Sequence, residues 1–323
     1  MRLKRIAGLV CLLVFMTSCT TTGKPTIEST PAITQTSVVE PTATALPTET
    51  SVPLTETASS TQTIAAATDA PTSWLDYPIV PEVSEAMKQV YLRGLAVGHQ
   101  PNRFSKIGDC QNVNSYFLGM FDGGTYRLGE QYAYLQPTID FFAGSWNRKS
   151  LAVHGGLNVA AVLSSTWTPI MEKYTKQEVC KDGESPLMCE LRVNNPSFAL
   201  ISMEESWAGS YDIYDTYMRQ IVEYTLSLNI VPILATRTEL PTQDRQINSI
   251  ILKIAQDYDV PLWNFGASVA DLPDVGIRPG DEFHLTEGKP FFDDPEQMKN
   301  AWPWRNLTAL QAIDAVSKAV GAQ

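Results

Sequence analysis

The sequence predicts a three-layer α/β/α sandwich around a doubly wound, mostly parallel sheet of five strands. Two observations favour this fold. From residue 75 onward, short β-prone runs alternate with longer amphipathic runs of helical period. The run Ser197–Met203, "SFALISM", is almost continuously apolar, which is typical of a strand buried on both faces of a parallel sheet.

The expected strands are short and lie between turns or helices. The first ends abruptly at Gly-Asp-Cys, and the second, "SLAVHG", ends at a pair of glycines. The third is the apolar run already described, and the last two, "IVPILAT" and "VPLWNF", each follow an amphipathic run. In chain order we expect strands at 103–108, 150–155, 197–203, 230–236 and 260–265.

The expected helices are runs whose apolar residues recur with the helical period of 3.6. The run "YDIYDTYMRQIVEYTLSLN" is the longest of them, and the final run begins near Arg305 or Asn306. The second helix in chain order is expected to begin after the glycine pair at 155–156. In chain order we expect helices at 81–98, 157–163, 211–229, 242–258 and 305–320.

Residues 1–18 have the features of an export signal. Arg2, Lys4 and Arg5 precede an apolar run, 6–16, that is shorter than the roughly 20 residues needed to cross a bilayer core. The sequence "MTSC" resembles the bacterial lipobox, which implies cleavage of a lipoprotein signal peptide and lipidation of Cys19. Without lipidation, cleavage near Ser18 would give a secreted protein. Both outcomes place the chain outside the cytoplasm.

Residues 19–74 are expected to form a disordered tether. The segment up to Ser73 consists mainly of Thr, Ser, Pro and Ala, and the first aromatic residue after the signal is Trp74. Such a composition buries too little apolar surface to offset the entropy lost on ordering. Residues 75–323 then form one domain, which is long enough for a sizeable core.

The charge of the chain excludes several classes of partner. Removing the three cations of the signal lowers the formal net charge from −11 to −14. An acidic surface of this kind argues against nucleic acid and against direct binding to anionic lipid. We therefore expect membrane contact through the N-terminal lipid alone, a small-molecule or saccharide ester as substrate, a monomer, and no organic cofactor.

Three cysteines remain once the signal and Cys19 are set aside. Cys180 and Cys189 flank a Gly- and Pro-containing segment that can close as a loop, so we expect a disulfide between them in an oxidising compartment. Cys110 is left as a thiol. We expect no zinc site, because none of the three histidines is at ligand spacing from the Cys pair.

Polar residues follow several of the expected strands. In a doubly wound fold these positions share one edge of the sheet, where ligands bind. Asp281 and His284 lie in a late loop, three residues apart. The other positions are Asp109 and Cys110 after the first strand, Gly155 and Gly156 after the second, and Glu204, Glu205 and Ser206 after the third.

These residue types suit acyl transfer. Asp281 can bind one imidazole nitrogen of His284 and leave the other as a general base. Cys110 can then act as the nucleophile, because a thiolate is strongly nucleophilic and a neighbouring imidazolium lowers the pKa of a thiol. Backbone N–H groups at Cys110 and Gly156 can receive the developing oxyanion.

The same motifs resemble those of the SGNH/GDSL hydrolase superfamily. "FSKIGDC" resembles its first block, in which Gly-Asp-Ser carries the nucleophile, and "GDEFH" resembles the last, Asp-x-x-His. "GGLNVAAVL" resembles the second block and "PSFALISMEESW" the third. The resemblance covers nearly the whole domain. It implies a flavodoxin-like sandwich and hydrolysis of carboxylic esters or of acetyl groups on saccharides, with Gly156 and Ser206 at the oxyanion.

Two departures from that pattern weigh against activity. Cys110 stands where the family has Ser, and Glu204 and Ser206 stand at the family's Gly and Asn. A carboxylate about 4 Å from an oxyanion costs on the order of 4 kcal/mol at an effective dielectric of 20, close to a thousandfold in rate. Glu204 escapes this cost if it points away from the pocket or is neutral.

Several alternatives stay open at this point. The fold could have lost its chemistry and bind a cell-surface glycan or another small ligand, with Cys110 a small buried residue and the Asp281–His284 pair a loop hydrogen bond. Glu204 and Glu205 are more often a solvated pair than ligands of a cation. Trp302 and Trp304 either cover the edge of the core or stack on a sugar. The "NLT" pattern at Asn306 matches a glycosylation site and is interpreted as coincidental in a bacterial lipoprotein.

Overall fold

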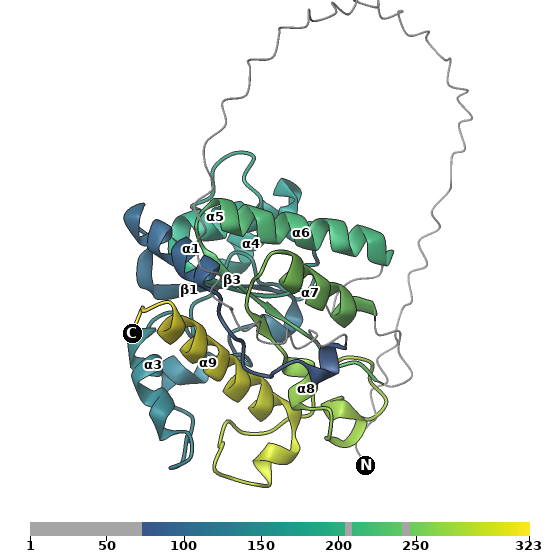
Figure 1. Cartoon of the computed structure of the whole chain (residues 1–323). Helices are drawn as coiled ribbons and strands as arrows, with labels where there is room; N and C mark the ends of the chain where they lie inside the picture. The colour runs from purple at the N-terminus through teal and green to yellow at the C-terminus, as the bar shows by residue number, and fades with distance from the viewer. Residues whose placement is uncertain (1–72, 204–208, 241–245) are drawn as a thin grey trace, which may run out of the picture. The chain divides into compact units, whose positions relative to one another are not determined.

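The computed structural model describes residues 73–203, 209–240 and 246–323 (Figure 1). The expected signal, Cys19, the tether, and Glu204, Glu205 and Ser206 lie outside these residues. No helix among the described residues is both long and apolar enough to cross a membrane.

A parallel four-stranded sheet forms the centre of the domain. Its strands, in spatial and chain order, are β1 (Gln100–Gly108), β2 (Pro196–Ser202), β3 (Val231–Ala235) and β4 (Leu262–Trp263). All seven residues of β2 and all five of β3 are buried, as expected for strands covered on both faces. The predicted α/β fold with a parallel sheet is confirmed, with four strands instead of five.

The expected strand at 150–155 is wrong. Only Val153 forms a bridge, to Gly108 of β1. Around this bridge the Gly108 N–H donates to the Ala152 carbonyl (2.9 Å) and the His154 N–H donates to the Gly108 carbonyl (3.3 Å). Earlier in the segment, side chains replace the ladder: the Ser150 hydroxyl donates to the Lys106 carbonyl (2.7 Å), and the Leu151 N–H donates to the Glu190 carboxylate (2.9 Å). The pairing with β1 is therefore limited to a single bridge.

The expected helix at 157–163 is also wrong. The segment forms turns and one short 3-10 helix, Ala161–Leu163. The Asn158 carboxamide oxygen accepts from the N–H groups of Ala160 (3.1 Å) and Ala161 (2.9 Å). Bonds of this pattern are those of a helix N-cap, yet the chain leaves the helical conformation after Leu163.

Nine α-helices occur within the described residues. The bounds of the nine helices are α1 Glu85–Ala96, α2 Met120–Gly123, α3 Gln136–Phe141, α4 Thr168–Thr175, α5 Pro186–Asn194, α6 Tyr211–Ser227, α7 Gln246–Asp257, α8 Phe265–Ser268 and α9 Ala301–Ala319. Ser84 caps α1 by accepting from the Met87 N–H (3.4 Å), and Ser185 caps α5 by accepting from the Met188 N–H (3.3 Å).

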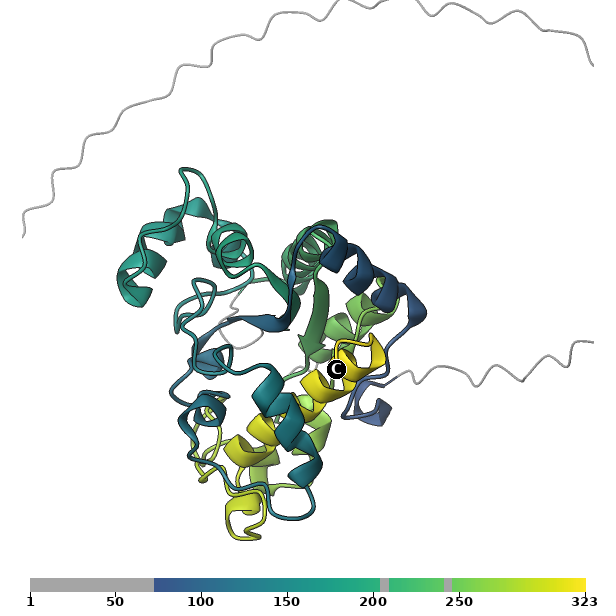
Figure 2. The same ribbon diagram turned by 90° about the vertical axis from the view of Figure 1, so that its left-hand side faces the viewer.

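The helices cover both faces of the sheet. On one face, Phe198 of β2 stacks on Tyr91 of α1 (5.5 Å between centroids) and meets Phe142, next to α3, edge-on (5.7 Å). On the other face, Ser105 of β1 donates to Glu190 of α5 (2.6 Å). Figure 1 shows α5, α6 and α7 along one side of the strands and α3 and α9 along the other; Figure 2 separates the same groups from a second direction. The domain is therefore a three-layer α/β/α sandwich.

Helix α9 is joined to the rest of the domain by buried polar bonds. The Asn306 carboxamide oxygen accepts from the Leu118 N–H (2.7 Å), and its amide donates to the carbonyls of Tyr116 (3.1 Å) and Trp302 (3.0 Å). Asn306 is 2% exposed. Its three bonds hold the segment that follows Cys110 against α9.

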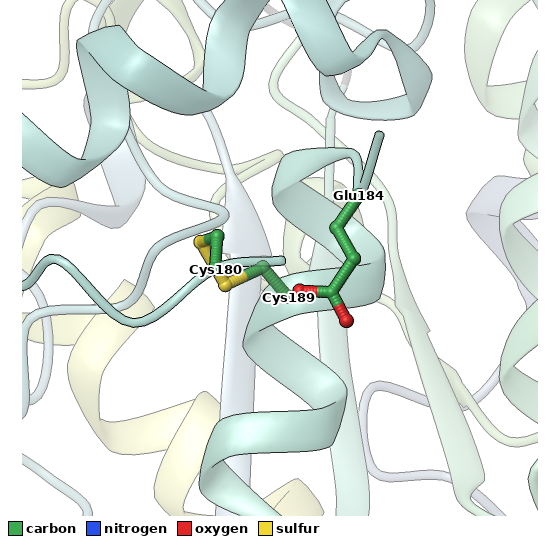
Figure 3. A group of neighbouring side chains, drawn as sticks. All are labelled: Cys180, Glu184 and Cys189. Carbon is green, nitrogen blue, oxygen red and sulfur yellow. A yellow bond between two sulfur atoms is a disulfide. The ribbon is translucent and has the colours of Figure 1, made fainter. Parts of the chain in front are cut away.

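The expected disulfide between Cys180 and Cys189 is present and ties the segment before α5 to that helix. The Glu184 carboxylate lies beside the two sulfurs (Figure 3). It accepts from the Arg192 guanidinium (2.7 Å), and this bond is the main cause of the lowered pKa of Glu184. With the sulfurs bonded to each other and the carboxylate paired, these three side chains act as a structural staple.

Replacing both cysteines of the staple with alanine should lower the free energy of unfolding by about 2–3 kcal/mol, because a loop of nine residues is released in the unfolded chain. Urea unfolding of Cys180→Ala/Cys189→Ala and of the wild type measures the difference. In excess reductant the wild type should fall to the stability of the variant. A variant as stable as the oxidised wild type would contradict the expectation.

Lys106 of β1 is a buried lysine, with 3% of its surface exposed. Its ammonium donates to the Trp146 carbonyl (2.8 Å) and, at longer range, to the Phe117 carbonyl (3.5 Å). Burial, with a smaller contribution from Arg148, lowers the pKa of Lys106 to about 7, against the opposing effects of Glu190 and Asp122. The folded protein thus binds this proton less tightly than the unfolded chain does.

The free energy of unfolding should therefore rise with pH between about 7, the pKa of Lys106 in the folded protein, and 10.5, the ordinary pKa of a lysine. In that window the unfolded chain holds more protons than the folded protein. Lys106→Met removes the titrating group, so its stability curve should be flatter there. Urea unfolding at several pH values measures both slopes, and equal slopes would contradict the lowered pKa.

Candidate active site

The turn after β1 places Cys110 at the carboxyl edge of the sheet. A short 3-10 helix, Cys110–Asn112, follows Gly108, and the buried Asp109 carboxylate accepts from the Gln111 N–H (3.2 Å). The Asn112 amide donates to the Ser202 carbonyl at the end of β2 (2.9 Å). A Cβ at Gly108 would lie 2.1 Å from that amide nitrogen, so the sharp turn requires glycine.

Asp281 and His284 form a hydrogen-bonded pair in the late loop. One carboxylate oxygen of Asp281 accepts from the His284 Nδ1 (2.8 Å). The other accepts the backbone N–H groups of Glu282, Phe283 and His284 (2.7, 3.1 and 3.1 Å). The backbone bonds from His284 and Phe283 are the main cause that holds the pKa of Asp281 far below its usual range, and the bonds from the imidazole and from the Glu282 N–H lower it further. Asp281 is therefore an anion that orients His284 and leaves Nε2 facing away from the carboxylate.

The loop that carries this pair is itself fixed. Ile277 and Leu285 form an antiparallel bridge, and the Arg278 N–H donates to the His284 carbonyl (2.8 Å). The Arg278 guanidinium donates to the Leu285 carbonyl (3.0 Å). The imidazole, about half exposed, thus projects from a braced loop.

One hydrogen bond joins the Cys110 turn to the His284 loop. The Gln111 amide donates to the Phe283 carbonyl at 2.6 Å. Gln111 follows Cys110 directly and Phe283 directly precedes His284, while the Phe283 and His284 rings lie 4.1 Å apart. The two segments therefore meet although 172 positions separate the bonded residues.

A third segment, 154–156, lies against the same turn. A Cβ built on Gly155 would be 3.7 Å from the Cβ of Cys110, and the His154 N–H donates to the Gly108 carbonyl (3.3 Å). The N–H of Gly156 donates to the Nδ1 of His154 (3.1 Å). Gly156, which the motif places at the oxyanion, has its N–H directed at the histidine instead, and Gly155 is the glycine in contact with Cys110.

The N–H of Gly155 has no hydrogen-bond partner within the described part of the chain. Both Gly155 and Gly156 are exposed. An exposed, unengaged N–H beside a thiol is the kind of donor that an oxyanion can use. The remaining expected site residues, Glu204, Glu205 and Ser206, follow the end of β2 and lie outside the described residues.

A buried polar network fixes where the third segment lies. The Glu190 carboxylate of α5, fully buried, accepts from Ser105 of β1, from the Leu151 N–H and from the Arg148 guanidinium (3.0 Å between Nη2 and Oε2). It thereby connects β1, the segment before His154, and α5. Periodicity gives no signal for Gln111, Arg148 or Glu190, because the contacts of each are with residues far away in the sequence.

The chain matches no family model and no curated protein. Among solved structures it is similar to a GDSL-like lipase from Bacteroides thetaiotaomicron, with 12% sequence identity and a TM-score of 0.38. That alignment covers 76% of this chain and 100% of the lipase. At this TM-score the likeness does not bear on the chemistry of the site.

Replacing Glu190 with glutamine should lower the free energy of unfolding by about 3 kcal/mol, because the largely buried Arg148 guanidinium and its neighbouring donors lose their anion. Asp215→Asn is a matched control: its pair with Arg219 is partly exposed and should contribute less than about 1 kcal/mol. Urea unfolding measures both variants. A loss for Glu190→Gln no larger than that for Asp215→Asn would contradict the structural role.

Proposed function

We propose that this protein is an SGNH/GDSL-like ester hydrolase, held outside the cytoplasm by a lipid on Cys19, that acts on carboxylic esters or acetylated saccharides. The observation that supports it most is the bond between Gln111 and Phe283 (2.6 Å). It brings the turn bearing Cys110 to the loop bearing the Asp281–His284 pair. A thiol and an oriented imidazole on adjoining segments are the parts that nucleophilic acyl transfer requires.

In the proposed reaction His284 takes the Cys110 thiol proton at Nε2, and the sulfur attacks the ester carbonyl carbon. The tetrahedral intermediate collapses to a thioester as the alcohol leaves with the proton held by His284. Water, deprotonated by His284, then attacks the thioester and releases the carboxylic acid, and the proton returns to sulfur. Asp281, kept ionised by its backbone bonds, stabilises the imidazolium at both stages.

The oxyanion is assigned to the N–H groups of Cys110 and Gly155, with the Ser206 hydroxyl as a third donor. Gly155 takes the place of Gly156 because it contacts Cys110 and its N–H is unengaged among the described residues, whereas the Gly156 N–H is bonded to His154. Each such donor typically contributes about 10² to 10³ in rate. Glu204, at the position of the family's glycine, must be neutral or turned away for this assignment to hold.

The second candidate is a saccharide-binding protein that keeps the fold without the chemistry. Two observations favour it: the Gly156 N–H is bonded within its own loop, and the sequence has Glu204 and Ser206 where the family has Gly and Asn. A binder would retain Asp281 and His284 as a structural pair. Direct assay separates the two functions.

Hydrolysis of p-nitrophenyl acetate by the purified protein should fall at least about a thousandfold in kcat/KM in Cys110→Ala and in His284→Ala, since each removes a reacting group. Acid quenching during turnover should trap an acyl group on Cys110, seen by mass spectrometry. The unchanged stability of both variants in urea is the control for folding.

The binder is favoured instead if Cys110→Ala hydrolyses the ester as fast as the wild type. It is favoured as well if hydrolysis appears only when Cys110→Ser is combined with Glu204→Gly and Ser206→Asn. Either result would rule out the proposed hydrolase function.

A further inference from the structure

A groove of about 540 Å³ lies between two segments that lead away from the candidate active site. One wall contains Ser115 and Tyr116, five and six residues after Cys110, and the other begins at Glu287, three residues after His284. At no more than about 3.6 Å per residue, both walls start within roughly 22 Å of the candidate reacting groups. The volume is in the range of small-molecule sites, roughly 300–1,000 Å³.

An exposed tyrosine forms an aromatic platform in this groove. Tyr116 is 56% exposed, and its ring stacks on that of Trp302, which is 9% exposed, with centroids 5.8 Å apart. Its backbone is fixed as well, because its carbonyl accepts from Asn306 (3.1 Å) and its N–H donates to the Val113 carbonyl (3.0 Å). Trp302 thus belongs to the core. The Tyr116 ring is exposed to solvent, and its position is fixed by the stacking and by the backbone bonds.

Polar groups of both charges surround the platform. Glu287 and Lys289 lie on the opposite wall, and the Lys289 N–H donates to the Gln297 carboxamide oxygen (2.7 Å). Glu287 also pairs with the Arg278 guanidinium (2.6 Å). A wall with both signs of charge does not select an anion or a cation, and an open groove with a polar rim does not suit an acyl chain. It suits a neutral ligand with an apolar face and polar edges.

We propose that this groove binds a neutral saccharide chain and that Tyr116 is its stacking residue. A pyranose ring has an apolar face of C–H groups, which matches the tyrosine ring, and equatorial hydroxyls at its edge, which match Glu287, Lys289 and Gln297. This assignment rests on the proposed function: it makes the ester an acyl group on a saccharide, whose chain extends from Cys110 and His284 along the groove.

Calorimetric titration of the purified protein with cellohexaose, xylohexaose and chitohexaose tests the groove without requiring hydrolysis. At least one should bind with a Kd below about 5 mM, and Tyr116→Ala should weaken that binding roughly tenfold. Tyr116→Phe keeps the ring and should bind within about threefold of the wild type. Tyr134→Ala, which removes an equally exposed tyrosine outside the groove, should bind as the wild type does.

A kinetic comparison then ties the groove to the ester site. Tyr116→Ala should raise KM for acetylated xylo-oligosaccharide and leave hydrolysis of p-nitrophenyl acetate unchanged, because the small ester does not reach the groove. Absence of binding to all three hexaoses, or equal binding by Tyr116→Ala and the wild type, would overturn the saccharide assignment. If the protein hydrolyses no ester at all, the proposed hydrolase function is wrong. The titration still tests whether the groove binds a saccharide.

Discussion

The position of one segment of the candidate site, 154–156, depends on a buried carboxylate of α5. Glu190 is fully buried and receives donors from β1, from Arg148 and from the segment at Leu151. Desolvating a carboxylate costs several kcal/mol unless such donors replace water, so α5, β1 and that segment have to be assembled together. Leu151 lies four residues before Gly155. Glu190, together with the backbone bonds of Ala152 and His154 to Gly108, therefore sets where the glycine meets Cys110.

The site is assembled from segments that are held by polar bonds to neighbouring backbone more than by regular secondary structure. Hydrogen bonds of the Asp109 and Asn112 side chains hold the turn after β1, and that of Asn112 joins it to the end of β2. In the late loop, the Asp281 carboxylate accepts three backbone N–H groups. Gln111 then links the two at Phe283. Because each bond is internal to the protein, the arrangement of the two segments does not depend on a bound ligand, and such preorganisation is what the proposed hydrolysis would require.

Much of this can be predicted from sequence, for identifiable reasons. The buried strands β2 and β3 carry continuous apolar runs, and the Cys180–Cys189 disulfide follows from a short flexible loop between two thiols. The expected strand at 150–155 is wrong because its pairing with β1 is limited to one bridge, beside which Glu190 and Ser150 bond the backbone, and periodicity does not reveal such distant side-chain bonds. The expected helix at 157–163 is wrong because the chain leaves the helical conformation after one short 3-10 turn. The meeting of the Cys110 and His284 segments follows from the positions of the strand ends, whereas Gln111 and Tyr116 carry no pattern that marks their role.

The bonding of Asn306 has a consequence for how the protein can be produced. Its carboxamide is the acceptor in an Asn-Leu-Thr sequon, yet in the folded domain it is 2% exposed and makes three hydrogen bonds inside α9 and to the Leu118 region. An oligosaccharyltransferase in a eukaryotic secretory host could reach it only on the nascent chain. A glycan added there would keep the helix from seating, so such a host would deliver two populations: native, unmodified chains and glycosylated chains unable to close the domain.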